Sequence, residues 1–225
     1  MSTEFLSGCA RCKLEPSIQR CRTPQGKAPK FCPTEYKSEL TSKAAAEYSK
    51  DDIYEFARQA SIQESECYAD RELGYDKVRT TKPRIVEIIE FAQKMNYKRL
   101  GLAFCAGLRK EAAVVEKLLC NHGFEVVSAI CKAGCQEKAA IGITDEQKVA
   151  PGKPESMCNP VLQAMILNDA NTEFNILVGL CVGHDSLFFK YADAMTTVFV
   201  AKDRVLGHNP LAAIYNIDSY YRSLK

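Results

Sequence analysis

The chain has 225 residues, of which 30 are Lys or Arg and 28 are Asp or Glu, so its formal net charge is only +2. A nearly neutral chain lacks the basic field that nucleic-acid-binding proteins usually need, and we expect no nucleic-acid partner. The longest apolar run, residues 174–183, is too short to cross a bilayer, and the first residues lack the pattern of an export signal. We therefore expect a cytoplasmic protein without membrane association.

Eleven cysteines are the feature of the composition that stands out. Thiols in the cytoplasm are kept reduced, so a disulfide framework is not expected. The remaining roles for these cysteines are metal ligands, catalytic thiols and small buried apolar residues, and their spacing has to distinguish these roles.

In chain order, the composition predicts three segments. Residues 1–48 contain four cysteines and few large aliphatic side chains, so this extension cannot build a core of its own. Residues 49–97 have helical periodicity and are expected to pack on the core. Residues 98–225 alternate strand and helix patterns, with strands expected at residues 100–104, 124–130, 175–180 and 196–201. Helices are expected between them, one with Val161, Leu162, Met165 and Ile166 facing inward.

This alternation predicts the α/β class: an open, mostly parallel, Rossmann-like sheet of about four strands with flanking helices. The Cys-rich, metal-binding extension precedes it. The usual doubly wound strand order, 2-1-3-4, is the one we expect.

The first cysteine group lies in the extension. Cys9 and Cys12 form a Cys-x2-Cys pair, and Cys21 and Cys32 supply two further thiols from a Pro-containing loop. Four sulfur ligands match tetrahedral Zn2+ or a [4Fe–4S] cluster. Pro33 directly follows Cys32, and this ending favours the [4Fe–4S] cluster. Four unrelated thiols are the alternative.

The second group lies at the ends of predicted strands. Cys105, Cys131 and Cys181 each end a strand, and Cys158 comes just before the helix that Pro160 opens. Ligands of open parallel sheets bind at the carboxyl ends of the strands. The four cysteines are therefore expected to bind a cofactor, as a second metal centre, or to form a catalytic thiolate site.

His184 follows Cys181 on the same edge and could move protons, ligate a metal or cap a short helix. We predict His184, Cys181 and Cys105 as the catalytic residues. Cys120, beside Leu119 at a helix end, is expected in the core. Signature motifs of nucleotide-binding proteins, serine hydrolases and zinc proteases are not found in the sequence.

The motifs around these cysteines resemble an uncharacterised prokaryotic family, whose members are described as cysteine-rich, metal-binding proteins of unknown function from anaerobes and archaea. The resemblance covers the N-terminal cysteine segment and most of residues 83–215. It is carried by these stretches: Ala103-Phe-Cys-Ala-Gly-Leu108, Cys131-Lys132, Met157-Cys-Asn-Pro160, Gly179-Leu-Cys-Val-Gly-His-Asp185 and Lys202-Asp-Arg-Val-Leu-Gly-His-Asn-Pro210. It implies metal binding at the first cysteine group and makes the second group and His184 signature positions.

The sequence therefore predicts a cysteine-ligated metalloprotein that performs redox or sulfur-transfer chemistry on a small molecule. Its partners would be a small molecule or a protein that exchanges electrons or metal. Two alternatives stay open: a non-enzymatic metal carrier or sensor, and an interaction module in which zinc only stabilises the extension. The sequence leaves the oligomeric state open.

Overall fold

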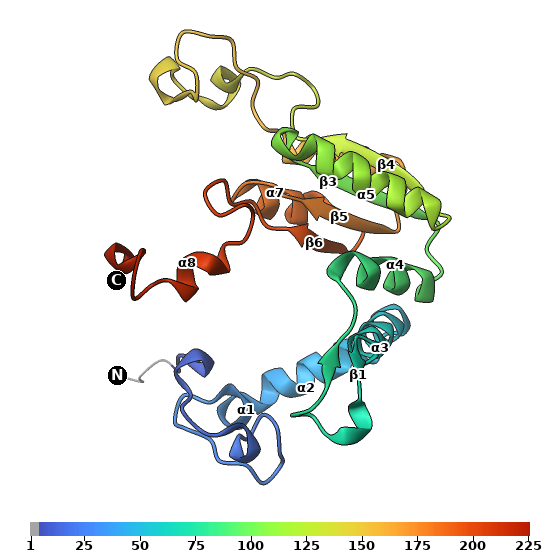
Figure 1. Ribbon diagram of the computed structural model, residues 1–225, viewed down its shortest axis with the longest axis vertical. Coiled ribbons are helices and arrows are strands. Elements are labelled where there is room, and N and C mark those ends of the chain that lie inside the picture. Colours follow the sequence, from blue (N-terminus) through green and yellow to red (C-terminus); the bar gives the residue numbers. More distant parts are fainter. Residues whose placement is uncertain (1–4) are drawn as a thin grey trace. The chain divides into compact units, whose positions relative to one another are not determined.

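The computed structural model describes residues 5–225, and the chain divides into two compact units, Met1–Ser65 and Glu66–Lys225. Figure 1 shows the elements of both units, each of which is described by itself. None of the helices among the described residues is long and apolar enough to span a membrane.

The first unit begins with irregular chain and ends in helices. Two short 3-10 turns, Cys9–Arg11 and Pro16–Ile18, precede α1 (Pro33–Tyr36), α2 (Ser38–Glu47) and α3 (Asp51–Glu66), which ends one residue beyond the unit. No residue between positions 5 and 50 is fully buried. As the composition predicts, this extension has no hydrophobic core of its own.

The second unit opens with a small antiparallel pair of strands, β1 (Tyr68–Ala69) and β2 (Arg79–Thr80). Helix α4 (Arg84–Lys94) follows and buries Ile88, Ile89, Phe91 and Ala92 along one stripe. The ring of Phe91 lies 5.5 Å from that of Phe174, centroid to centroid. Phe174 begins a strand of the central sheet, so α4 belongs to the same core as the sheet.

The central sheet has four parallel strands: β3 (Arg99–Phe104), β4 (Glu125–Ile130), β5 (Phe174–Val178) and β6 (Thr196–Val200). Their order is β4-β3-β5-β6. This is the expected 2-1-3-4 order, and the predicted α/β class with an open parallel sheet is confirmed. The order reverses between β3 and β5, where the connections leave toward opposite faces of the sheet.

Helices cover the sheet on two sides. Helix α5 (Arg109–Asn121) packs on β3 and β4, while α6 (Pro160–Asp169) and α7 (His184–Tyr191) pack against each other. Right-handed crossovers in this strand order place α5 on one face and α6 with α7 on the other. The short helix α8 (Leu211–Tyr215) and a 3-10 turn, Arg222–Leu224, end the chain.

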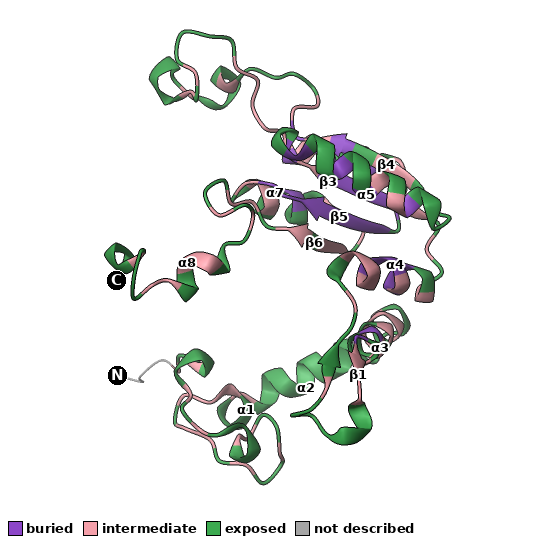
Figure 2. Ribbon diagram, in the orientation of Figure 1, coloured by how far each residue is buried: buried purple, intermediate pink, exposed green. Residues whose placement is uncertain are grey.

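The core follows from the strand sequences. All five residues of β5 are buried, as is typical of a central parallel strand covered on both faces (Figure 2). A core cluster lies on the α6–α7 side of the sheet and includes Ala103, Ala129, Leu167, Leu177 and Phe188. The cysteines that follow β3 and β4 belong to this cluster.

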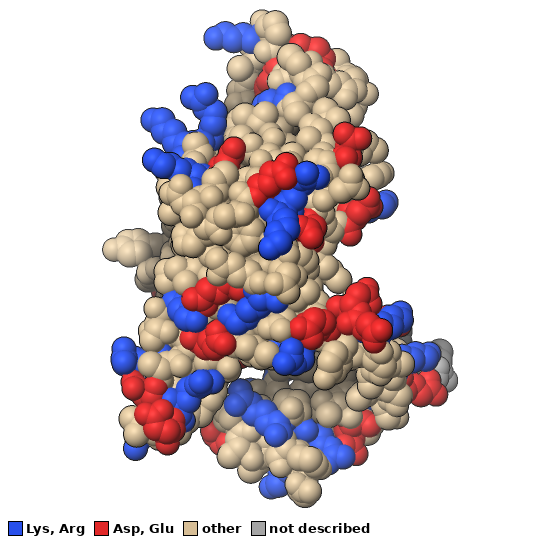
Figure 3. Space-filling model, turned by 90° about the vertical axis from the view of Figure 1, so that its right-hand side faces the viewer, with Lys and Arg blue, Asp and Glu red and all other residues tan. Residues whose placement is uncertain are grey.

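The molecular surface carries both charge signs. Figure 3 shows acidic and basic side chains interspersed over the face it presents, in keeping with the small net charge. Several of these charges form ion pairs within the second unit, such as Lys82 with Glu90 at 2.6 Å and Lys94 with Glu66 at 2.8 Å.

Between β4 and α6 the chain makes a long excursion, residues 132–158, seen in yellow in Figure 1. It contains two 3-10 turns, Lys138–Ile141 and Asp145–Gln147. Its two ends run antiparallel, with a bridge between Glu137 and Ser156 and a hydrogen bond from the Met157 amide to the Gln136 carbonyl at 2.7 Å. The excursion therefore leaves the sheet edge and returns to the same place.

Candidate functional site

Two of the strand-end cysteines continue the hydrogen-bond ladder of the sheet. The Cys105 amide donates to the Val178 carbonyl at 3.1 Å, and the Cys131 amide donates to the Phe104 carbonyl at 2.9 Å. Their backbones are therefore fixed by the neighbouring strands. The side chains of Cys105 and Cys131 are buried in the core cluster on the α6–α7 side.

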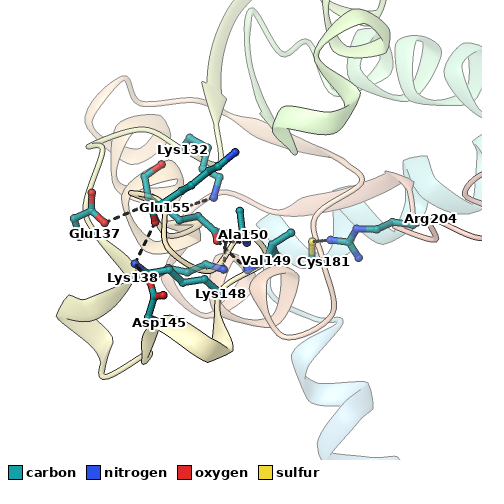
Figure 4. Close-up of polar contacts among 12 residues, drawn as sticks. Lys132, Glu137, Lys138, Asp145, Lys148, Val149, Ala150, Glu155, Cys181 and Arg204 are labelled. Carbon is teal, nitrogen blue, oxygen red and sulfur yellow. Dashed lines mark hydrogen bonds and ion pairs between the residues drawn. The ribbon is translucent and has the colours of Figure 1, made fainter.

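The excursion brings Cys158 to this edge. The Asn159 amide donates to the Cys131 carbonyl at 2.7 Å, and the Lys132 ammonium donates to the Ser156 carbonyl (Figure 4). Asn159 also caps α6, because its side-chain oxygen accepts from the Leu162 amide at 3.0 Å. These contacts place Cys158 beside Cys131, although 27 positions separate the two residues.

The two sulfurs form a hydrogen-bonded pair. The Cys131 thiol donates to the Cys158 sulfur, and this bond, helped by the positive charges of Lys132 and His184, lowers the pKa of Cys158 to about 5 against the opposing effect of burial. The same bond and its own burial raise the pKa of Cys131, although the Ala106 amide donates to its sulfur at 3.3 Å. At neutral pH the pair thus holds one proton on Cys131 and one negative charge on Cys158.

Cys181 lies on the same edge but has a different partner. Its sulfur accepts a hydrogen bond from the Arg204 guanidinium at 2.9 Å (Figure 4). The Cys181 carbonyl accepts from the His184 and Asp185 amides at the start of α7, at 2.9 and 3.1 Å. The segment after β6 therefore supplies a cation to the residue that follows β5.

Lys202 brings a second cation to the same edge from the same segment. A Cβ on Gly107 would lie 3.1 Å from the Lys202 Nζ and 3.9 Å from the Cys105 Sγ, so both atoms are close to the turn that follows β3. Gly179 has a φ of +70°. A Cβ on this residue would lie 2.0 Å from the Leu108 Cδ1 and 3.6 Å from the Lys202 Cδ. Both the positive φ and this close contact require glycine at position 179.

A polar network holds the excursion together (Figure 4). The Glu155 carboxylate forms an ion pair with Lys138 at 2.6 Å and accepts from the amides of Val149 and Ala150 at 2.9 and 3.3 Å. The Lys138 ion pair is the main reason that the pKa of Glu155 lies below its usual value. Lys148 pairs with Asp145 at 2.9 Å in the same way.

The first cysteine group shares one cavity in the first unit. Cys9, Cys12, Cys21 and Cys32 all line a space of about 320 Å3, together with the basic residues Arg20, Arg22 and Lys27. Backbone hydrogen bonds close the loop around it, including Gly8 amide to Phe31 carbonyl at 3.3 Å and Arg20 amide to Lys27 carbonyl at 2.9 Å. The structure thus brings these four predicted ligands to one place.

The donor set of this cavity fits a thiolate-ligated centre. Four thiolates are soft ligands suited to zinc or iron–sulfur, and the basic lining offsets their negative charge. Within residues 5–225, however, no three Cys, His, Asp or Glu side chains converge to hold one metal ion. In a [4Fe–4S] site each thiolate binds a different iron, so the four cysteine sulfurs lie farther apart than they do around a single zinc ion.

The predicted residues of the sheet edge thus fall into two sets. In the first set, Cys131 and Cys158 shift each other's pKa, Cys105 raises the pKa of Cys131, and His184 lowers that of Cys158. The second set is Cys181, whose sulfur contacts Arg204. The expectation that Cys120 is in the core is wrong, since its side chain is exposed. From the sequence we assigned no role to Lys132 and Lys202. Both come just after a predicted strand, which is the position that pointed to the cysteines.

Comparison with known proteins places the chain in a family. A model of a family described as "Protein of unknown function (DUF1847)" matches residues 32–199. The chain is 42% identical over 194 residues to an uncharacterized protein of the archaeon Methanocaldococcus jannaschii, a match that covers 85% of this chain and 92% of that protein. No solved structure matches the chain. From these matches we conclude that the chain belongs to the DUF1847 family.

Proposed function

We propose that the protein carries out thiol-dependent redox or sulfur-transfer chemistry on a small molecule at the Cys158–Cys131 pair. We further propose that Cys9, Cys12, Cys21 and Cys32 bind a [4Fe–4S] cluster or Zn2+. The observation that carries the first proposal is the position of the two thiols: Cys131 is buried in the core cluster, Cys158 packs against it, and the hydrogen bond between them lowers the pKa of Cys158. This is the arrangement that a nucleophilic thiolate and a resolving thiol require.

In the proposed reaction the substrate is a small disulfide. The Cys158 thiolate attacks one sulfur, the S–S bond of the substrate breaks, and the leaving sulfur departs with the electron pair as a thiolate. Once Cys158 is in the mixed disulfide, its negative charge is gone and no longer raises the pKa of Cys131.

Cys131 then gives its proton to the departing thiolate and attacks the Cys158 sulfur. The second half of the substrate leaves as a thiolate. The substrate has gained two electrons, the pair has lost two as a Cys131–Cys158 disulfide, and an external dithiol closes the cycle by reducing it. With a persulfide, the Cys158 thiolate instead attacks the outer sulfur, the S–S bond of the substrate breaks, the inner sulfur leaves as a thiolate, and Cys158 becomes a persulfide.

The groups around the pair support each step. Lys132 and His184 favour the thiolate of Cys158 electrostatically. Cys105 lies close enough to Cys131 to contribute to the raised pKa of Cys131. In this proposal His184 and Cys105 act on the pair, and Cys158 takes the nucleophilic role that we had expected of Cys105 or Cys181.

The thiolate-ligated centre would supply electron transfer if it is a cluster, and only structural support if it is zinc. The four cysteines would hold it, with Arg20, Arg22 and Lys27 offsetting its charge. A carrier or sensor of metal would use the same cysteines without turnover, and exchange of the bound metal with a chelator distinguishes that alternative.

The pH dependence of Cys158 alkylation tests the proposal for the pair. With the pKa of Cys158 near 5, about nine-tenths of it is thiolate at pH 6, whereas a thiol with the ordinary value near 8.5 is less than about 1% ionised there. We expect iodoacetamide to label Cys158 at pH 6 far faster than the exposed Cys120, as measured by peptide mass spectrometry.

Replacing Cys131 by alanine removes the hydrogen bond that lowers this pKa, so the midpoint of the labelling profile should move to higher pH. The variant C120S is the matched control for loss of a cysteine and should keep the wild-type profile. Labelling of Cys158 that begins only near pH 8.5 in the wild type would contradict the proposal.

A further inference from the structure

The cations at the sheet edge point to the charge of the substrate. We infer that the site selects a small disulfide or persulfide that carries a carboxylate or phosphate group, bound by Lys202 and Arg204 while its sulfur meets Cys158. This inference rests on the proposed function and adds the substrate class to it.

Three basic residues follow the carboxyl ends of the two outer strands. Lys202 and Arg204 follow β6, Lys132 follows β4, and the Lys202 ammonium stands beside the turn after β3. Lys202 thus reaches from the end of β6 to the turn after β3, and Arg204 contacts Cys181 after β5, whereas Lys132 lies at the end of the outer strand β4. The Lys202 Nζ and the Cys105 Sγ both lie within 4 Å of one point above Gly107, and Cys105 in turn acts on Cys131. This chain of contacts links the cation to the reactive pair.

These three cations differ from other lysines of the second unit in their partners. Elsewhere in this unit lysines form ion pairs, such as Lys138 with Glu155 and Lys148 with Asp145. Within the described residues 5–225, neither Lys132, Lys202 nor Arg204 forms an ion pair with a carboxylate.

Two carboxylates of the segments after β5 and β6 accept hydrogen bonds from neighbouring amides. Asp203 accepts from the amides of Val205 and Leu206 at 2.9 and 2.8 Å, and Asp185 accepts from the Ser186 amide at 2.8 Å. Neither carboxylate forms an ion pair with Lys202 or Arg204, so both cations keep N–H donors for an anionic ligand.

The donor groups of Arg204 and Lys202 suit an anion with several oxygens. Arg204 uses one donor on the Cys181 sulfur, and a guanidinium has further N–H groups in the same plane. Lys202 is half-buried, so its ammonium is held near the edge. A carboxylate or phosphate suits this combination of a planar guanidinium and a point charge better than a neutral or cationic group does.

The experiment compares three disulfides of similar size. The probes are 3,3′-dithiodipropionate, which is a dianion, bis(2-hydroxyethyl) disulfide, which is neutral, and cystamine, which is a dication. The rate at which the free Cys158 thiol is lost, either to the adduct or to the Cys131–Cys158 disulfide, is measured under anaerobic conditions by peptide mass spectrometry, and each rate is divided by that of the same probe with free N-acetylcysteine. We expect the order dianion, neutral, dication, and a smaller spread at higher ionic strength.

Variants assign this preference to residues. K202Q and R204Q should each slow the dianion about threefold, the effect of one charge acting across several Å of water, and leave the neutral probe within twofold. The matched control K117Q, an exposed lysine on α5, should change neither rate. Equal normalised rates for all three probes, or an equal loss for all three in K202Q, would overturn the inference.

A binding measurement separates this inference from the proposed function. The dianion 3,3′-thiodipropionate has a thioether in place of the disulfide, so it cannot react. We expect it to bind the variant C158S and to lose affinity when K202Q is added, as measured by calorimetry. Binding without any reactivity of Cys158 would end the proposed function and keep the anion site. Reactivity of Cys158 without binding of the thioether and without a preference for the dianion would end the anion site and keep the proposed function.

Discussion

At the scale of single residues, a buried glutamine links the helix layer to the sheet just below the reactive pair. Gln163 on α6 is fully buried, and its side-chain amide donates to the carbonyls of Phe104 at 3.2 Å and Ala129 at 2.7 Å. These carbonyls belong to the residues just before Cys105 and two before Cys131. Gln163 thereby fixes the ends of β3 and β4.

We expect Gln163→Met, which keeps the volume but loses both hydrogen bonds, to lower the free energy of unfolding by about 1–3 kcal/mol. Buried backbone carbonyls that lose their partner are costly, and methionine offers no donor. Urea denaturation followed by circular dichroism measures the change. Gln93→Met, at an exposed position of α4, is the matched control. An unfolding free energy equal to that of the wild type would show that the two bonds contribute nothing net.

Gln163 also shows the limit of sequence patterns at this scale. The apolar residues predicted an inward face that includes Met165, but Met165 is 52% exposed, while Gln163, Ala164 and Leu167 are buried. Helix α6 is apolar on nearly every side, so its residues do not define one face. Similarly, Leu119 is buried but Cys120, one position on and rotated by about 100°, is exposed.

At the scale of elements, the strands could be predicted because each is a short apolar run between polar turns. The predicted strand 100–104 is Arg99–Phe104 in the structure, and 196–201 is Thr196–Val200. The strand ends then placed Cys105 and Cys131 at the edge. The sequence also predicted Cys158 at this edge, but its specific pairing with Cys131 could not be predicted, because it depends on how the polar excursion 132–158 folds back.

The network around Glu155 is the feature of the excursion that a variant can test. We expect Glu155→Gln to loosen residues 138–156, because it removes the ion pair with Lys138 and weakens the bonds to the Val149 and Ala150 amides. Hydrogen exchange of these amides should become faster, and the oxidised Cys131–Cys158 disulfide should form more slowly. Glu146→Gln, whose interactions are local, is the control in the same excursion.

The pH dependence of this effect has a definite sign. The folded pKa of Glu155 is lowered, so its ionised form favours the folded excursion at pH values above the unfolded value near 4.5. That contribution is lost as the pH falls through the lower, folded value. The wild type should thus approach the exchange rates of Glu155→Gln only in acid. Equal exchange in both proteins at pH 7 would contradict the role of Glu155.

At the scale of the whole molecule, the two cysteine groups lie in separate units, Met1–Ser65 and Glu66–Lys225. The first unit has no buried residue between positions 5 and 50 and four thiols around one cavity. The second has a conventional core under its sheet. If the four thiols bind the proposed centre, the first unit depends on that centre for stability, as small metal domains do, whereas the second unit does not.

This difference predicts how the protein responds to loss of one N-terminal ligand. Protein purified without oxygen should contain iron and sulfide and show broad visible absorption, or contain one zinc without colour. Cys12→Ser should abolish the bound metal and make residues 5–50 sensitive to protease. The rate of Cys158 alkylation at pH 6 should stay within twofold of the wild type, because every group that lowers its pKa belongs to the second unit.

C120S serves as the control for losing a thiol outside both sites. A Cys12→Ser protein that keeps its metal would contradict the assignment of the first group, and one that loses Cys158 reactivity together with the metal would show that the two sites depend on each other.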